Sequence, residues 1–253
     1  MAVIIDTPRP DHIPGLRRLW QEAFGDTDAF LDDFFSAAFS PERCFCVFDG
    51  DIPVSVVYWF GCSCREKSIA YLYAVATDTR CRGRGLCKTL MEHTHAHLKN
   101  LGYAGTILVP GSEDLFRFYE KLGYRTCVLA REDFCTPGTT PARLENLDPE
   151  TFARLRRSYL PEGSVVQEGE NLAFLETQVQ FYAGKDFLLA ASRQGTNLYA
   201  PEFLGNPAAR SQILCALGCT EGTFRGPGGD IPFAMYLPFT CDAAPNWFGF
   251  AFN

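Results

Sequence analysis

Hydrophobic and polar positions alternate clearly in the first half of the chain and less regularly in the second. Residues 69–76 are apolar and rich in aromatic and β-branched side chains, which predicts a buried strand. A short polar loop follows this strand. Beyond the loop, apolar residues recur near one helical face and predict an amphipathic helix: Leu86, Leu90, Met91, Leu98 and Leu101. Gly102 is expected to end that helix.

The flanking segments predict alternating strands and helices before and after this unit. Ahead of it we expect a strand at 2–5, helices at 11–24 and from Asp26 or Asp28 to 39, and strands 44–48 and 52–62 around a turn at 49–51. After it we expect a strand at 105–109, a helix at 112–122 capped by Ser112, and a strand at 124–129.

The second half begins after a break rich in proline, glycine and threonine at 136–141, which reads as a linker. Its pattern predicts helices at 149–160, 171–182 and 207–217, and strands at 187–191, 197–204, 220–225 and 233–237, the second of them interrupted by Pro201. This order loosely echoes the first half. We therefore expect a second, smaller α/β unit that either walls a site in the first unit or pairs with the open edge of its sheet.

The loop between the central strand and helix has the composition of an anion site. Residues 80–85 read Arg-Cys-Arg-Gly-Arg-Gly, and the helix begins directly afterwards. A helix N-terminus offers unpaired N–H groups and partial positive charge. Glycines let an anion approach the backbone, and arginines add forked donors. A Walker loop is excluded because no Gly-Lys-Ser/Thr follows, and a dinucleotide loop is excluded because Lys88 occupies the third glycine position.

Two motifs in the first half resemble one enzyme family. The spacing Arg80-x-x-Gly83-x-Gly85 resembles the pyrophosphate loop of the GNAT (Gcn5-related N-acetyltransferase) family. Downstream, Phe118-Tyr119-Glu120-Lys121-Leu122-Gly123-Tyr124 resembles that family's F-Y-x-x-x-G-F/Y signature. The resemblance covers roughly residues 1–130. It implies an α/β (α+β) GNAT fold, with a mixed central sheet flanked by helices at 1–135 and a degenerate GNAT-like α/β domain at 141–253.

The resemblance also implies a co-substrate, acetyl-CoA, and roles for particular residues. The pyrophosphate would bind to Arg80, Cys81, Arg82, Gly83, Arg84 and Gly85, and the pantetheine arm to Val75, Ala76 and Thr77. Tyr119 would be the acid that protonates the leaving thiolate. Family members often carry Asn where this chain has Ser112, so Ser112 is either a shorter pantetheine donor or, as we favour, simply a helix cap.

The general base is left open by the sequence. Residues 69–77 contain no Asp or Glu, so water, Tyr71, Tyr73 or Glu22 are candidates, although core packing is expected for at least one of the two tyrosines. Some tandem members of the family use their C-terminal carboxylate as a base, which adds Asn253.

Composition narrows the partners and the compartment. The net charge of −7 disfavours nucleic acid as a partner. No stretch reads as a signal peptide or a membrane span, so we expect a cytoplasmic protein without membrane contact, with its 11 cysteines reduced. Metal binding by His93 and His97, or by the pairs Cys44/Cys46 and Cys62/Cys64, is disfavoured, and we expect no metal.

The function that these features predict is acetyl transfer from acetyl-CoA to an amine. The acceptor is a small molecule or a peptide whose identity the sequence does not give. The alternative is a non-catalytic acyl-CoA-binding sensor, which would keep the loop but lack a base. We expect a monomer or a homodimer.

Overall fold

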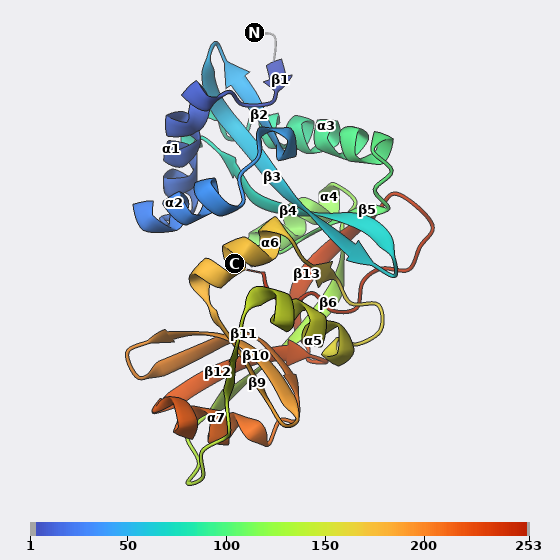
Figure 1. Ribbon diagram of the computed structural model, residues 1–253. Helices are drawn as coiled ribbons and strands as arrows, with labels where there is room; N and C mark the ends of the chain where they lie inside the picture. The colour runs from blue at the N-terminus through green and yellow to red at the C-terminus, as the bar shows by residue number, and fades with distance from the viewer. Residues whose placement is uncertain (1–3, 252–253) are drawn as a thin grey trace.

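The computed structural model describes residues 4–251 and has a long mixed sheet flanked by helices (Figure 1). The first half comprises β1 (Ile4–Asp6), α1 (Ile13–Phe24), α2 (Asp28–Ala37), β2 (Cys44–Asp49), β3 (Ile52–Cys64), β4 (Lys67–Thr77), α3 (Leu86–Asn100), β5 (Gly105–Leu108), α4 (Glu113–Lys121) and β6 (Arg125–Cys135). Short 3₁₀ turns lie at Pro10–His12, Pro41–Arg43 and Thr79–Cys81.

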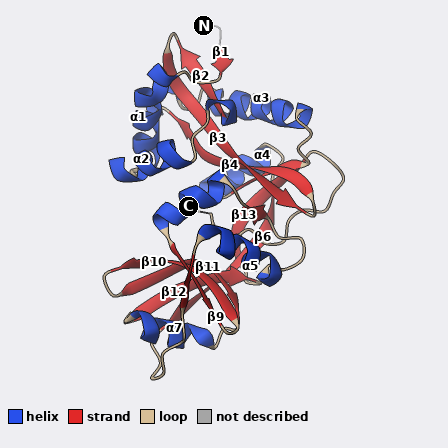
Figure 2. Cartoon of the chain, in the orientation of Figure 1, coloured by secondary structure: helices blue, strands red, loops and turns tan. Residues whose placement is uncertain are grey.

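The second half repeats this alternation with shorter elements (Figure 2). It comprises β7 (Glu145–Leu147), α5 (Pro149–Tyr159), β8 (Val166–Gln167), α6 (Glu170–Gln178), β9 (Gln180–Gly184), β10 (Phe187–Gln194), β11 (Asn197–Gly205), α7 (Ala209–Leu217), β12 (Glu221–Pro227) and β13 (Ile231–Pro238).

The two halves exchange their last strands. Among the described residues, the strand order is β1-β2-β3-β4-β5-β13-β6-β12-β11-β10-β9-β7, with β8 paired to β3 beside this path. Strand β13 from the second half therefore lies between β5 and β6, and β6 from the first half lies between β13 and β12. The C-terminal half thus pairs with the sheet edge that we expected to be open. The division into domains 1–135 and 141–253 stays a prediction, because one continuous sheet crosses it.

Helices cover both faces of the first half's sheet. Leu16, Trp20 and Phe34 of α1 and α2 are buried in one core, together with Tyr71 and Tyr73 of β4. The other face packs against α3 and α4 in a core that includes Leu72, Leu90 and Tyr119. Because side chains alternate along a strand, successive residues of β4 belong to these two separate cores. Helix α6 lies against α2 and β3, so the second half closes the first core from one side.

Most of the predicted elements of the first half are confirmed, including the hairpin at 49–51 and the Ser112 cap. The expected strand at 2–5 overlaps β1, although residues 2 and 3 lie outside the described range. The predicted cap of α2 was wrong: the side chain of Thr27, rather than Asp26 or Asp28, accepts the hydrogen bond from the N–H of Phe30. Asp26 is instead engaged by Trp20.

In the second half, the predicted helix at 171–182 was wrong at its end. Helix α6 stops at Gln178, and residues 180–184 form β9, paired with β10 and β7. Periodicity could not separate a short apolar strand from the end of a helix. Strand β11 continues through Pro201, but its pairing with β10 is interrupted there by a bulge, as the sequence suggested. Proline is tolerated at this position because it lies in the bulge opposite β10 and because the pairing of β11 with β12 ends at Ala200.

Candidate functional site

Strands β4 and β5 separate soon after they begin to pair. Their parallel register contains only Ala70 with Thr106 and Tyr71 with Ile107, whereas β4 continues to Thr77. The gap opens into a cavity of about 520 Å³. This volume lies within the range of small-molecule sites in proteins. We call it the β4–β5 cavity.

A β-bulge shapes the strand that borders this cavity. Ala76 pairs with Val56 and Tyr73 pairs with Tyr58, so two residues of β4, Ala74 and Val75, oppose the single residue between them on β3. Ala74 has φ of +47°, in the left-handed region that residues other than glycine rarely adopt. Such a bulge interrupts the ladder and re-aims the neighbouring side chains. Both bulge residues line the cavity.

The cavity connects the two faces of the sheet. From the face covered by α1 and α2 it is lined by Trp20, Ala23, Phe24, Asp26, Phe30, Tyr71, Tyr73 and Ala74. From the face covered by α3 and α4 it is lined by Leu72, Val75, Leu108, Leu115 and Tyr119, with residues 109–112 at the end of β5. Two reactants entering from opposite faces would therefore meet at the β4–β5 gap.

Tyr119 lies in the wall of the cavity on the α3 and α4 side. Its side chain is 6% exposed, and its hydroxyl makes no hydrogen bond to any described residue. Burial, and to a smaller degree Cys87, raises the pKa of Tyr119 above its ordinary value. The phenol therefore stays protonated at neutral pH.

The glycine loop (residues 80–85) ends at the N-terminus of α3. Gly83 and Gly85 have φ of +75° and +77°, and no atom lies within 4 Å of the position that a Cβ would take on either residue. The first backbone N–H that bonds within the helix is that of Thr89, which bonds to the carbonyl of Gly85. No side chain caps the helix. The preceding N–H groups are thus available to an anion.

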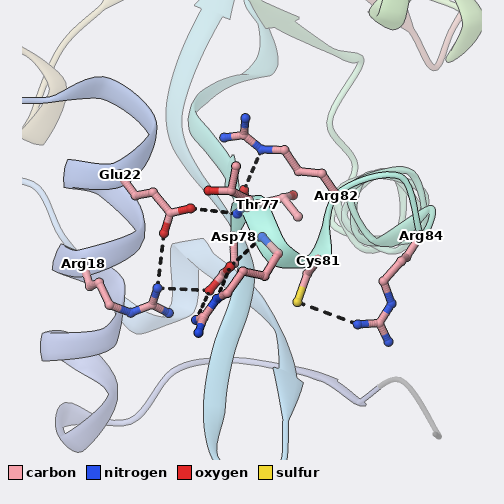
Figure 3. A network of polar contacts seen from close by, with 9 residues as sticks. Arg18, Glu22, Thr77, Asp78, Cys81, Arg82 and Arg84 are labelled. Atoms are coloured by element: carbon pink, nitrogen blue, oxygen red, sulfur yellow. Dashed lines mark hydrogen bonds and ion pairs between the residues drawn. The ribbon is translucent and has the colours of Figure 1, made fainter.

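A network of ion pairs holds the start of this loop (Figure 3). Asp78, 1% exposed, accepts hydrogen bonds from the guanidinium of Arg80 at 2.7 and 3.0 Å and from Arg18 Nη1 at 3.0 Å. The bond from Arg80, partly opposed by burial, lowers the pKa of Asp78 far below its usual value. Glu22 accepts a hydrogen bond from the N–H of Thr79 at 2.7 Å and also pairs with Arg18. Helix α1 is therefore fastened to the loop.

The other predicted loop residues project from this anchored base. Arg82 Nε donates to the carbonyl of Thr77 at 3.1 Å, and Arg84 Nη1 lies 3.7 Å from the Cys81 sulfur. Arg80, Arg82 and Arg84 are not buried. The loop thus presents guanidinium groups beside the uncapped start of α3.

The remaining predicted residues divide between the cavity and the scaffold. Val75, Ser112, Tyr71 and Tyr73 line the cavity, whereas Ala76 and Thr77 do not. The Ser112 hydroxyl accepts from the N–H of Leu115 at 3.4 Å, as a cap should. Glu22 belongs to the network described above. The candidate base at Asn253 lies outside the described residues.

Sequence reasoning missed two carboxylates. Asp78 precedes the loop directly, and its position before an arginine-rich turn was an available signal. Asp26 was seen only as a cap, although it lies in the cavity wall. Its importance depends on Trp20 and Tyr73, which the fold brings beside it.

The two cysteine pairs are buried in the core, whereas His93 is exposed and His97 is half-buried. His93 and His97 pack edge-on against Phe45, and Cys44 and Cys46 are buried with their sulfurs 4.0 Å apart. Among residues 4–251, no group of three or more His, Cys, Asp and Glu side chains is placed to hold a metal ion. None of the helices in that range combines the length and apolar character that crossing a bilayer requires.

The sequence matches one protein-family model, and the fold is similar to several solved acetyltransferase structures. Residues 5–127 match the family model of the acetyltransferase (GNAT) domain. A GCN5-related N-acetyltransferase from Kribbella flavida has the same fold over 93% of this chain and 70% of its own, with a TM-score of 0.70 and 14% identity. A GCN5-related N-acetyltransferase from Anabaena variabilis is similar over 93% of this chain and 72% of its own, with a TM-score of 0.69 and 15% identity. A putative acetyltransferase from Pyrococcus horikoshii is similar over 94% of this chain and 90% of its own, with a TM-score of 0.65 and 11% identity. No curated protein matches the sequence.

Proposed function

Residues 5–127 belong to the GNAT acetyltransferase domain family, and from this premise we propose that the protein transfers an acetyl group from acetyl-CoA to an amine. The observation that carries the proposal is the arrangement along β4. The strand separates from β5, bulges at Ala74, and leads through Asp78 into an open glycine loop at the N-terminus of α3. Tyr119 faces the same cavity.

The residues present fit acetyl-CoA on chemical grounds. The loop combines uncapped helix N–H groups with Arg82 and Arg84, which suits a pyrophosphate. The cavity between the separated strands is mostly apolar near Val75 and Leu108, which suits a pantetheine arm. Acetyl-CoA, when bound, supplies the thioester acyl group.

In this proposal, Tyr119 gives its proton to the sulfur that leaves. Its position in the cavity wall and its hydroxyl, which bonds to no described residue, support that role. Backbone N–H groups at the bulge, around Val75, are candidates for stabilising charge on the carbonyl oxygen. Holding both reactants in the gap supplies orientation. The proton of the amine leaves through water or through Tyr73, which lines the cavity on the other side.

We also propose that residues 141–253 are a degenerate second unit of the same kind. Strands β11 and β12 pair in parallel over four residues, and this pairing ends at Ala200. Ala200 and Pro201 form a bulge opposite Ala191, at the place that Ala74 and Val75 occupy in the first half. Directly after this bulge, Glu202 is buried in an ion pair with Arg156 and accepts a hydrogen bond from Trp247 Nε1. Buried side chains therefore lie beside the second bulge, whereas the first bulge borders a cavity.

Isothermal titration with acetyl-CoA and with CoA tests the proposal. Gly83→Asp adds a negative charge where the pyrophosphate would bind, whereas Gly83→Asn has nearly the same shape without the charge. Both side chains tolerate left-handed backbone better than most. We expect micromolar binding by the wild type, a modest loss in Gly83→Asn, and a further loss of at least about tenfold in Gly83→Asp.

Turnover distinguishes the enzyme from the sensor. Release of free thiol from acetyl-CoA in the presence of an amine would support acyl transfer. Binding without thiol release across a broad amine panel would favour the acyl-CoA sensor. Absence of binding by the folded wild type would overturn both.

A further inference from the structure

On the side covered by α1 and α2, the β4–β5 cavity is lined by aromatic residues and a single charged residue. Asp26 is the one charged residue among the described residues that line the cavity, and no Lys, Arg, His or Glu accompanies it. Its neighbours in the wall on the α1 and α2 side are aromatic: Trp20, Phe24, Phe30, Tyr71 and Tyr73. A ligand on this side therefore meets one negative charge within an apolar, aromatic surface.

The carboxylate of Asp26 is hydrogen-bonded through only one of its two oxygens. Its Oδ2 accepts a hydrogen bond from Trp20 Nε1 at 2.7 Å. Asp26 makes no ion pair, and its other oxygen has no hydrogen-bond partner within residues 4–251. The nearby arginines of α1 are engaged elsewhere: Arg17 pairs with Asp28 and Asp32, and Arg18 pairs with Glu22 and Asp78. A free carboxylate oxygen is thus available to a cationic group.

The aromatic rings beside Asp26 form a tight group around Trp20. The Trp20 ring lies 5.6 Å from Tyr73, 6.2 Å from Phe30 and 5.8 Å from Phe24, measured between centroids. Phe24 is 48% exposed and so marks the solvent-facing margin. Aromatic faces attract an ammonium group and also bury an apolar body.

We propose that the acceptor is an apolar primary monoamine whose ammonium group is recognised by Asp26 and whose body packs against Trp20, Phe30 and Tyr73. This inference rests on the proposed acyltransferase function and names its substrate class. A second ammonium in the cavity would lack a carboxylate partner, so polyamines and other polycations are poor acceptors. A carboxylate beside the amine would meet Asp26 without any cation to balance it, so free amino acids are poor acceptors as well.

Three matched probes test the substrate class: phenethylamine, phenylalanine and spermidine. Phenethylamine and phenylalanine share one ring and one amine and differ by the carboxylate. We expect kcat/KM for phenethylamine to exceed that for either of the others by at least about tenfold, measured as thiol release at saturating acetyl-CoA. Equal use of phenylalanine, or preference for spermidine, would overturn the inference and leave acyl transfer intact.

Two variants test the role of Asp26. Asp26→Asn keeps an oxygen that can accept from Trp20 Nε1 and removes the charge. Asp28→Asn removes a carboxylate two residues away that does not line the cavity. We expect Asp26→Asn to raise KM for phenethylamine about tenfold with kcat within about twofold, and Asp28→Asn to leave both unchanged. An unchanged KM in Asp26→Asn would overturn the recognition role.

Direct titration separates this inference from the proposed function. Phenethylamine is titrated into the protein saturated with CoA, and acetyl-CoA is titrated into the protein and each variant. Weaker phenethylamine binding in Asp26→Asn, with unchanged acetyl-CoA binding and melting temperature, is the expected result. If the wild type itself did not bind acetyl-CoA, the proposed acyltransferase function would be refuted instead.

Discussion

Asp78 and Arg80 are joined by a two-point ion pair, with Arg80 Nη2 2.7 Å from Asp78 Oδ2 and Arg80 Nε 3.0 Å from Asp78 Oδ1. Bidentate contacts of this kind fix orientation as well as charge. Because Asp78 also accepts the N–H of Arg80, three bonds define the first turn of the glycine loop. The arginine expected to bind phosphate therefore also fixes the loop that would hold it.

Asp78→Asn is expected to weaken acetyl-CoA binding by about tenfold. The substitution removes the charge that Arg80 and Arg18 share, so the loop loses its fixed conformation before the ligand arrives. Isothermal titration measures the effect. Asp133→Asn, which removes an aspartate from ion pairs with Arg131 and Arg210 far from the loop, is the control and should bind normally.

The same carboxylate makes stability depend on pH. The pKa of Asp78 is lower in the folded protein than in the unfolded chain. The stabilisation that Asp78 gives the folded state is therefore fully present above its pKa in the unfolded chain, which is near 4. It is lost as the pH falls toward the lower pKa of Asp78 in the folded protein. The difference in melting temperature between wild type and Asp78→Asn should be constant from pH 7 to pH 5 and shrink from pH 4 to pH 2. A constant difference throughout would contradict this assignment.

Tyr119→Phe is expected to lower kcat by about 10²–10³-fold, the usual contribution of a positioned acid. Acetyl-CoA affinity should change less than about twofold, because the hydroxyl makes no hydrogen bond that organises the cavity. Tyr124→Phe is the matched control: its hydroxyl contacts Thr106 and His95 at 2.8 Å, so its loss should cost about 1 kcal/mol of stability and leave kcat nearly unchanged. Equal kcat losses in the two variants would argue against Tyr119 as the acid.

The pH profile of kcat offers a separate test of the acid. Burial raises the pKa of Tyr119 above 10, so its protonated form persists throughout the neutral and mildly alkaline range. Between pH 7 and pH 9.5, kcat should not fall through loss of this proton. A descending limb near pH 8 that disappears in Tyr119→Phe would refute the expected ionisation.

Two adjacent arginines allow a buried ion pair to be compared with an exposed one. Arg156 and its partner Glu202 are 2% and 1% exposed, whereas Arg157 and Glu168 are half exposed. Glu202→Gln leaves a buried guanidinium without a countercharge and should destabilise the protein by about 3–5 kcal/mol. Glu168→Gln should cost no more than about 1 kcal/mol. Urea denaturation of both variants measures the difference, and similar values would show that Glu202 is not needed to balance Arg156.

Local sequence chemistry predicted much of the first half. Ser112 caps α4, and Gly102 follows the end of α3. These features depend on a residue and its immediate neighbours. The GNAT resemblance, carried by residues 80–85 and 118–124, is matched by the family assignment of residues 5–127.

What the sequence did not reveal depends on distant contacts. The bulge at Ala74 needs β3 as a partner, and the role of Asp26 needs Trp20 and Tyr73. The end of α6 at Gln178 is set by β10, which recruits residues 180–184 into the sheet. No local pattern indicated that β13 lies between β5 and β6. The roles assigned to loop and cavity residues stay predictions until ligand binding is measured.

The exchanged strands bear on how the chain reaches its native state. Strand β5 has no neighbour on one side until β13 has been synthesised, and β6 bonds only to strands of the second half. During translation, the first half therefore emerges with an unpaired sheet edge at β5, whose Leu108 lines the cavity and later pairs with Met235. A chain that stops before β13 would carry the glycine loop and Tyr119 beside an unpaired edge of β5, and we expect it to lack a properly closed cavity.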